Sequence, residues 1–233
     1  MTKLKNIDQN PQFLQTAVSG SRFVPMLFST DMVRAILNGT KTETRRIVKF
    51  PKIFDGKEVF DNSPNGLKYS FEDLLFRMES PVKVNNIIWV RETFCNDERG
   101  SESGQDDCFY YKADLPDDIW LGSWKPSLFM PKLAARIFLK VVSVSVERLQ
   151  DIDEESAINE GIENLSADEL KYNLFRNYLR SEKEVNYQNF TTDNPIWSYQ
   201  TLWQKINGKD SWDLNPFVWV YKFQRIDKPY GFR

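Results

Sequence analysis

The chain has 233 residues, of which 41% are hydrophobic and 14% aromatic, so it can bury a sizeable core and is not a disordered protein. Its formal net charge of -2 argues against indiscriminate binding to polyanions, and its two cysteines are too few for a disulfide framework. It has no histidine, which excludes Ser-His-Asp, Cys-His and zinc-hydrolase chemistry, so any acid–base catalysis must use Lys, Glu, Asp or Tyr.

The N-terminal part of the chain predicts a loose lead-in, a strand, a helix and a second strand. Residues 1–21 are polar and aperiodic, whereas the following SRFVPMLF segment favours a strand. The segment STDMVRAILNG carries helix signals at both ends, with Ser29 or Thr30 as the N-cap and Gly39 just beyond the C-terminus. β-Branched residues then alternate roughly, which predicts a strand that begins near Thr42.

The stretch NGTKTETRRIVK is basic, although the chain as a whole is slightly acidic. Within 38–49 it gathers Lys41, Arg45, Arg46 and Lys49 around a single acid. A local basic face on an acidic body favours recognition of one nucleotide or a short strand over wrapping of a long duplex. A merely solvated face is the alternative, and the charge pattern alone favours it.

The middle of the chain predicts strands separated by polar connections. Residues 50–83 are rich in proline and glycine and form an excursion with room for a hairpin. A strand is expected over 87–94, a polar loop over 96–107, and another strand over 108–113. Residues 124–132 are expected to be extended, because two of them precede a proline.

The C-terminal half predicts a long strand or a bent pair over 135–150, three helices and a closing strand over 216–226. The helices are expected over 151–162, 166–180 and 194–208. The start signals for these helices are Asp153 and Ser166 as N-caps and Pro195 at the first helical position. Separated strands linked by helices of unequal length favour an α+β fold with a mixed, curled sheet or a small barrel.

Lys41 and Thr44 are the first candidates for chemistry. Without histidine, a desolvated lysine with a lowered pKa is the natural activator of a hydroxyl nucleophile. In a regular strand positions 41 and 44 point to opposite faces, so both reach one site only if Lys41 lies in the turn or a bulge intervenes. A polar strand start with a snorkelling lysine is the alternative, and the spacing alone favours it.

Glu160 is the acid that stands out in the acidic helix. It lies in the last turn, just before Gly161, where a carboxylate is electrostatically unfavourable. Such a carboxylate is either solvated or held by a cation. Glu160 is therefore a candidate to orient or neutralise Lys41.

Two further segments offer side chains for binding. Alternation places Trp89 and Arg91 on one face of WVRETF and Glu92 on the other, where an aromatic ring and a cation suit a base and its phosphate or carbonyl. The alternative is that Trp89 is core and Arg91 pairs with an acid. WKPS offers Trp124 and Lys125 in a stiff, extended stretch that suits a pocket wall, although packing is the alternative for the indole. The candidate substrate-binding residues are Arg45, Trp89, Arg91, Glu92, Trp124, Lys125 and Ser127.

The tryptophans near the C-terminus have a structural interpretation. They lie on or beside the amphipathic helix and the closing strand. We expect the following indoles in the core: Trp197, Trp203, Trp212 and Trp219.

Together these segments resemble an ASCH-domain protein of the PUA-like superfamily, in the long form found in phages and prophages. FSTDMVRAILNGTKTETRR resembles the opening helix and the G-x-K-T-x-T-x-R segment of the family, and IIWVRETF resembles its L-W-V-R-E strand. The resemblance covers 24–49, 87–162 and 199–226. It implies a PUA-like small mixed β-barrel with flanking helices, in one domain over 22–233 with inserts at about 50–83 and 163–197.

The resemblance also implies an activity. Short bacterial members that are similar to this chain are amidohydrolases that remove the acetyl group from N4-acetylcytidine. Their catalytic lysine, threonine and glutamate correspond to Lys41, Thr44 and Glu160. This chain is about twice as long as those enzymes, and it has Asn85 and Asn86 where the family often has Gly-Asp.

Three functions compete on these grounds. The first is an amidohydrolase acting on an N-acylated pyrimidine nucleoside, in which Thr44 is the nucleophile, Lys41 takes its proton and Glu160 holds and tunes Lys41. Arg45, Arg91 or Lys125 would stabilise the oxyanion or contact the base. The second is a non-catalytic module that binds RNA or a modified base, and the third is an accessory protein whose cleft binds a protein. We expect a modified nucleoside or short single-stranded RNA as partner, a cytoplasmic protein, and no cofactor, metal or membrane.

Overall fold

The computed structural model describes residues 21–49, 59–60, 68–69, 79–97, 108–116, 123–166, 173–180 and 191–232. Nearly all of the expected lead-in and most of the expected loop at 96–107 lie outside these residues. Within the excursion at 50–83, β3 (Val59–Phe60) and β4 (Lys68–Tyr69) pair as the antiparallel hairpin for which the sequence left room.

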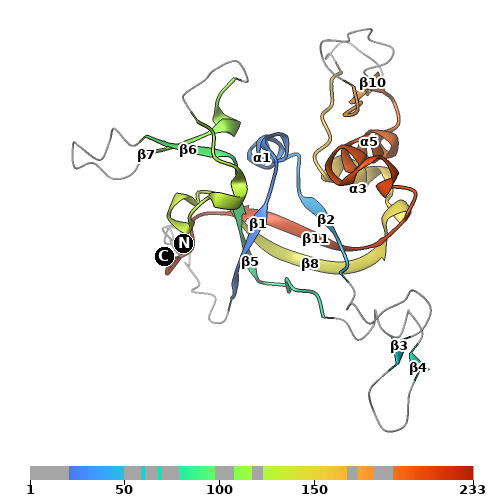
Figure 1. Cartoon of the computed structure of the whole chain (residues 1–233), viewed down its shortest axis with the longest axis horizontal. Helices are drawn as coiled ribbons and strands as arrows, with labels where there is room; N and C mark the ends of the chain where they lie inside the picture. The colour runs from blue at the N-terminus through green and yellow to red at the C-terminus, as the bar shows by residue number, and fades with distance from the viewer. Residues whose placement is uncertain are drawn as a thin grey trace, which may run out of the picture.

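A five-stranded mixed sheet with the order β1-β5-β8-β11-β2 forms the body of the molecule, as Figure 1 shows. The first pair is parallel and the other three are antiparallel. The strands are β1 (Phe23–Leu27), β2 (Glu43–Ile47), β5 (Ile87–Arg91), β8 (Phe138–Arg148) and β11 (Phe217–Ile226). The expected α+β class with a mixed sheet is thus confirmed.

The expected strand over 87–94 is interrupted. β5 ends at Arg91, and β6 (Phe94–Asp97) leaves the sheet to pair with β7 (Cys108–Tyr111) in a separate hairpin. The backbone of Phe94 also exchanges two hydrogen bonds with Lys125, at 2.8 and 3.2 Å, so the extended segment near residue 125 extends this second ribbon. Short 3-10 turns occur at Lys112–Asp114, Ser127–Phe129, Lys132–Ala134, Leu149–Asp151 and Lys209–Ser211.

The described part of the sheet does not close into a barrel, because β1 and β2 are its two edges. The helix α1 (Thr30–Leu37) connects these edges and lies across the opening between them (Figure 1). Ser29 caps this helix by accepting from the Met32 amide, and Gly39 follows it with a left-handed φ of +79°. The side chain of Arg46 bridges the opening, since its Nη2 donates to the Leu27 carbonyl oxygen at 2.8 Å.

Two further helices lie against one another beside β2 (Figure 1). They are α3 (Glu154–Asn159), where Asp153 accepts from the Ser156 amide at 2.7 Å, and α5 (Pro195–Asn207). Both helices were expected, and the N-cap Asp153 is confirmed. Pro195 occupies the first turn of α5, where a missing N–H costs nothing.

The expected helix over 166–180 is wrong in its described part. β9 (Phe175–Arg176) pairs there with β10 (Thr191–Thr192). The Oγ of Ser166, the expected N-cap, accepts from the Leu174 amide at 2.7 Å. The amide of residue 165 donates to the carbonyl of residue 174 at 2.7 Å. In the described part of the segment, backbone pairing with distant residues therefore overrides helix propensity.

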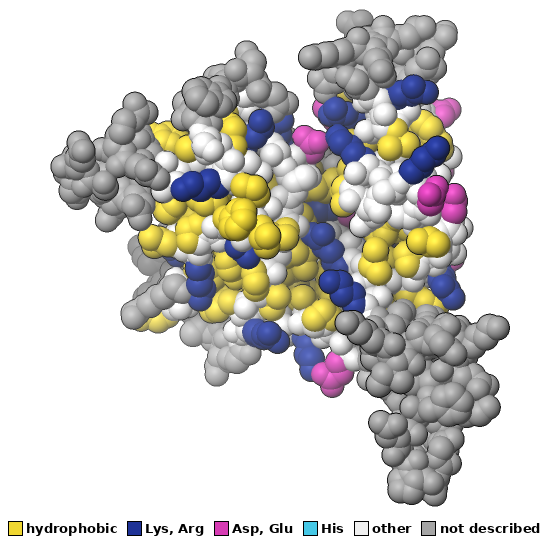
Figure 2. Space-filling model, viewed as in Figure 1, with side chains coloured by type: hydrophobic (Ala, Val, Ile, Leu, Met, Phe, Trp, Pro, Cys, Tyr) yellow, Lys and Arg dark blue, Asp and Glu magenta, His cyan; other side chains and the backbone are white. Residues whose placement is uncertain are grey.

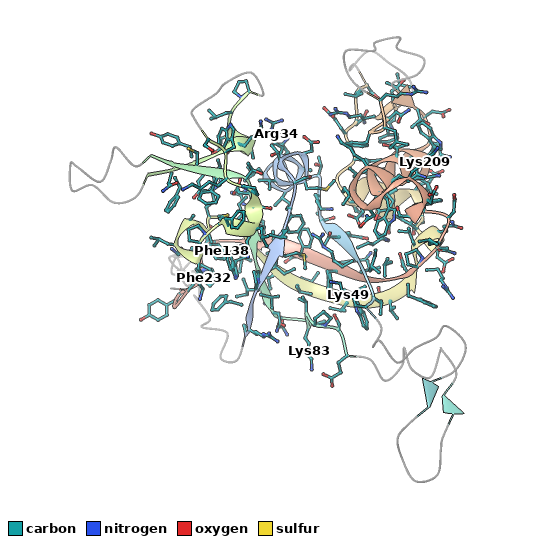
Figure 3. All side chains as sticks on the ribbon, in the orientation of Figure 1. Arg34, Lys49, Lys83, Phe138, Lys209 and Phe232 are labelled. Carbon is teal, nitrogen blue, oxygen red and sulfur yellow. The ribbon has the colours of Figure 1, made fainter. Side chains whose placement is uncertain are left out.

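Buried side chains form two clusters. The larger cluster lies between the sheet and the helices and contains three of the four C-terminal tryptophans, whereas Trp197 is exposed, so its expected core position is wrong. The smaller cluster surrounds Phe232, whose ring lies 4.7 Å from that of Phe138 and 6.0 Å from that of Trp89 (Figure 3). Trp89 is therefore a core residue, as the structural alternative proposed.

Candidate functional site

A cavity of about 370 Å³ opens between the two sheet edges and α5. On the face shown in Figure 2 the molecule is hollowed between the part that carries α1 and β1 and the part that carries α5, and Lys and Arg side chains lie along this hollow. The cavity is lined by Leu27, Phe28, Ser29, Met32, Lys41, Thr44, Arg45, Arg46, Ile47, Thr93, Ser127, Glu160, Tyr199, Leu202, Trp203, Ile206 and Asn207.

Lys41 and Glu160 form a buried ion pair in the wall of this cavity. The Lys41 Nζ donates to Glu160 Oε2 at 2.6 Å and to the Glu160 backbone oxygen at 2.7 Å, and both side chains are about 95% buried or more. Burial lowers the pKa of Lys41, and the Glu160 carboxylate opposes this only in part. The Glu160 carboxylate, at the C-terminal end of α3, is thus held by a cation, which was one of the two alternatives for a carboxylate at this unfavourable position.

Lys41 lies outside the regular strand, which begins at Glu43. Its backbone instead forms an isolated bridge with Glu160, and the Thr42 amide donates to the Asn159 carbonyl at 2.8 Å. Both Lys41 and Thr44 therefore reach the same cavity without obeying strand alternation.

Gly161 allows the close approach of α3 to Lys41. Its φ is +81°, and a Cβ added there would lie 2.7 Å from the Lys41 Cβ and 2.8 Å from the Ala35 Cβ. A side chain cannot be accommodated without displacing one of these segments. The glycine that ends the helix therefore also sets the position of Glu160 beside the amine.

Arg45 is surrounded by carboxylates and orients Glu160. Its Nε donates to Glu147 Oε1 at 2.8 Å, and its Nη1 lies 3.2 Å from Glu160 Oε1 and 3.5 Å from Glu43 Oε2. Lys222 pairs in turn with Glu43 at 2.7 Å. Because three carboxylates already neutralise it, Arg45 is poorly placed to stabilise a new negative charge in the cavity, which was one of its expected roles.

Arg46 lines the cavity but was not among the expected site residues. Its guanidinium carbon lies 5.1 Å from the centroid of the Phe28 ring, and among the described residues it has no carboxylate partner. Its Nε is buried and has no hydrogen-bond acceptor in the described part of the chain. Burial lowers the pKa of Arg46. Strand alternation does not separate Arg46 from Arg45, because both line the cavity.

Thr44 lines the cavity and is 4% exposed. Within the described residues no hydrogen bond joins its hydroxyl to the Lys41 amine. The proposed base and nucleophile thus share a cavity but are not hydrogen-bonded to each other. Catalytic hydrogen bonds are often long in ligand-free proteins and tighten when substrate is bound.

The remaining candidate residues divide into two groups. Ser127 lines the cavity, whereas Trp89, Arg91, Glu92, Trp124 and Lys125 do not. Arg91 donates through Nη2 to the Leu128 carbonyl and lies 5.5 Å from the Trp89 ring centroid, and Lys125 donates to Asn96 Oδ1 at 2.5 Å. The Lys112 amine lies 5.8 Å from the centroid of the Trp124 ring.

Glu92 belongs to a second buried charge cluster. Both of its carboxylate oxygens accept from Arg136, at 2.9 Å each, and Arg136 also donates to Asp114 at 2.6 Å. The guanidinium carbon of Arg136 lies 3.8 Å from the Tyr111 ring centroid. This clamp connects the end of β5 to the hairpin and the 3-10 turns, so its geometry is structural.

The described residues contain no group of three or more His, Cys, Asp or Glu side chains that would hold a metal ion. No helix in the described ranges is long and apolar enough to cross a membrane. The expectations of no cofactor and of a cytoplasmic location stay predictions. Comparison with protein-family models, with curated proteins and with solved structures found no match to this chain.

Proposed function

We propose that this chain is an amidohydrolase that acts on an N-acylated pyrimidine nucleoside of the N4-acetylcytidine type. The observation that carries the proposal is the buried Lys41–Glu160 pair in the wall of a cavity that Thr44 also lines. A cavity of about 370 Å³ suits a ligand of nucleoside size. In the same proposal the fold is an ASCH-type, PUA-like barrel, in which α1 and the Arg46 side chain cover the opening between β1 and β2.

The chemistry follows from the positions of these groups. The neutral Lys41 amine takes the proton of the Thr44 hydroxyl while the oxygen attacks the amide carbonyl. Arg46, which lacks a carboxylate partner among the described residues, stabilises the oxyanion. Collapse breaks the C–N bond, and Lys41 returns its proton to the departing exocyclic nitrogen. Water, activated by the same amine, then hydrolyses the threonine ester and releases the carboxylic acid.

Glu160 strengthens Lys41 as a base at the moment of proton transfer. The negative carboxylate favours the ammonium form that develops in the transition state, whereas burial lowers the pKa of the Lys41 amine. Arg45 and the Tyr199 hydroxyl, which lies 3.5 Å from Glu160 Oε1, keep this carboxylate in place.

The test is a turnover screen of the purified protein against acylated and otherwise modified nucleosides, with release of acetate from N4-acetylcytidine as the main readout. Lys41→Ala and Glu160→Ala are each expected to abolish turnover. The matched control is Lys83→Ala, because Lys83 is exposed, pairs with Glu79 on the surface and does not line the cavity (Figure 3). Turnover near the wild-type rate in either cavity variant contradicts the proposal, as does a wild-type protein that hydrolyses no acylated nucleoside.

A non-catalytic module that binds RNA or a modified base is the second candidate. It is favoured by one observation: the Lys41 amine is occupied by two acceptors and makes no hydrogen bond to Thr44. In that case the same nucleosides bind without turnover, and Lys41→Ala weakens binding, with the larger effect at low salt.

A further inference from the structure

The indole of Trp203 carries a donor without an acceptor. Its Nε1 is buried and has no hydrogen-bond partner among the described residues, and the residue as a whole is only 5% exposed. Buried N–H groups are nearly always paired, because water hydrogen bonds lost on folding must be replaced. The Trp203 side chain also lines the cavity.

The indole is held in place by its neighbours. Trp203 and Tyr199 lie on one face of α5, four residues apart, and their ring centroids are 6.3 Å apart. The hydroxyl of Tyr199 reaches Glu160, so the same helix that presents the indole also contacts the charged pair. The donor is therefore rigidly positioned relative to Lys41.

A second such donor comes from another element. The Arg46 Nε on β2 is buried and likewise has no acceptor in the described part of the chain. The lining of the cavity also includes the apolar side chains of Phe28, Met32, Leu202 and Ile206. The cavity therefore suits an apolar, planar body that carries two acceptor atoms.

We propose that Trp203 determines substrate specificity by donating its indole N–H to the ring carbonyl of the base, while Arg46 faces the acyl carbonyl. An N-acylated pyrimidinone carries two carbonyl acceptors, one on the ring and one on the exocyclic acyl group, so it offers one acceptor to each donor. This inference rests on the proposed function for the ligand class, but recognition of the base is measured by binding and does not require turnover.

The experiment measures affinity by calorimetry for two free bases that differ at the ring carbonyl and at the adjacent ring nitrogen N1, which carries a hydrogen in the first base and a lone pair in the second. N4-acetylcytosine has the ring carbonyl, and 4-acetamidopyrimidine lacks it. Wild-type protein is expected to bind the first at least about tenfold more tightly, the difference expected for one hydrogen bond to a buried donor. Trp203→Phe keeps the ring but removes the donor, so it is expected to lose about tenfold for N4-acetylcytosine and nothing for the analogue.

Trp219→Phe is the matched control, because Trp219 is equally buried in the larger core cluster but does not line the cavity. It is expected to keep the preference for N4-acetylcytosine. Equal affinity of wild-type protein for the two bases overturns the inference even if Trp203→Phe fails to fold, and so does a failure to bind either base. Unchanged binding in a folded Trp203→Phe overturns it too, because the indole then meets only water. Tight, Trp203-dependent binding without hydrolysis refutes the amidohydrolase and leaves this inference standing.

Discussion

Two buried charge clusters in this molecule use the same kinds of side chain for different purposes. Around Arg136, the Glu92 carboxylate is satisfied at both oxygens, and neither residue lines the cavity beside Lys41. Around Lys41, the amine lines a cavity, its pKa is lowered by burial, and a neighbouring guanidinium nitrogen has no acceptor among the described residues. Burial of a charged group therefore does not mark a site by itself; incomplete pairing beside a cavity does.

The strongest way to break this comparison is to disrupt the second cluster. Arg136→Met leaves the Glu92 carboxylate buried without its cation, since that side chain is 1% exposed. Because Arg136 itself is partly exposed, we expect a loss of about 3 kcal/mol of unfolding free energy, at the lower end for a broken buried pair. Urea denaturation measures this loss.

The catalytic rate constant of Arg136→Met should stay within about twofold of wild type wherever the variant is folded, because its cluster is outside the cavity. Lys41→Ala should show the converse pattern, with turnover lost. A folded Arg136→Met protein that has lost turnover to the same degree as Lys41→Ala would remove the distinction between the two clusters.

Glycine substitutions sharpen the comparison within the Lys41 cluster. Gly161→Ala places a methyl group 2.7 Å from the Lys41 Cβ, in addition to the left-handed φ of +81°, so we expect a loss of about 2 kcal/mol and a displaced Glu160. Gly39→Ala is the matched control, because its φ is +79° but nothing lies within 4 Å of the added atom. It should cost about 1 kcal/mol and leave binding of N4-acetylcytosine unchanged, whereas Gly161→Ala should weaken it. Equal losses in the two variants would show that close packing at Gly161 is unimportant.

The sequence predicted most of the elements whose signals are local. The caps Ser29 and Asp153 and the terminal glycines Gly39 and Gly161 act over a few residues, so α1 and α3 end where expected. The helix expected over 166–180 fails in its described part, 173–180, because the backbone there pairs with β10 and with residues 163–165, and no local rule contains that pairing.

In the candidate site, too, the residues with local signals were predicted and those that depend on tertiary packing were not. Helix-end electrostatics singled out Glu160, and the absence of histidine singled out Lys41, before any contact between them was known. Charge alone could not show that Arg46 rather than Arg45 is the guanidinium available to a ligand. The two residues are separated by the carboxylate neighbours of Arg45 and by the unpaired Nε of Arg46. Trp203 was assigned to the core, which is correct for its ring. Its unpaired N–H depends on tertiary packing and leaves no trace in the sequence.

The smallest expected effect concerns the protonation of Lys41. Burial is the main cause of its lowered pKa, and the Glu160 carboxylate is the main group that opposes the shift. Glu160→Gln removes that opposing charge, so the pKa of Lys41 should fall further, and the amine should stay neutral to a lower pH. An NMR titration of ¹³C-labelled lysine, with the Lys41 signal assigned from its loss in Lys41→Ala, measures this directly and does not depend on activity.

Glu92→Gln provides the contrast for this titration, because Glu92 does not contribute to the pKa of Lys41. The midpoint of the Lys41 signal should therefore coincide with that of wild type in Glu92→Gln and lie at lower pH in Glu160→Gln. The neutral amine is the active base, so turnover of wild-type protein should fall as the pH falls through the same midpoint. A Lys41 midpoint at or above the ordinary lysine value in wild-type protein would mean that the ion pair outweighs burial, and Lys41 would then be a structural cation like Arg136.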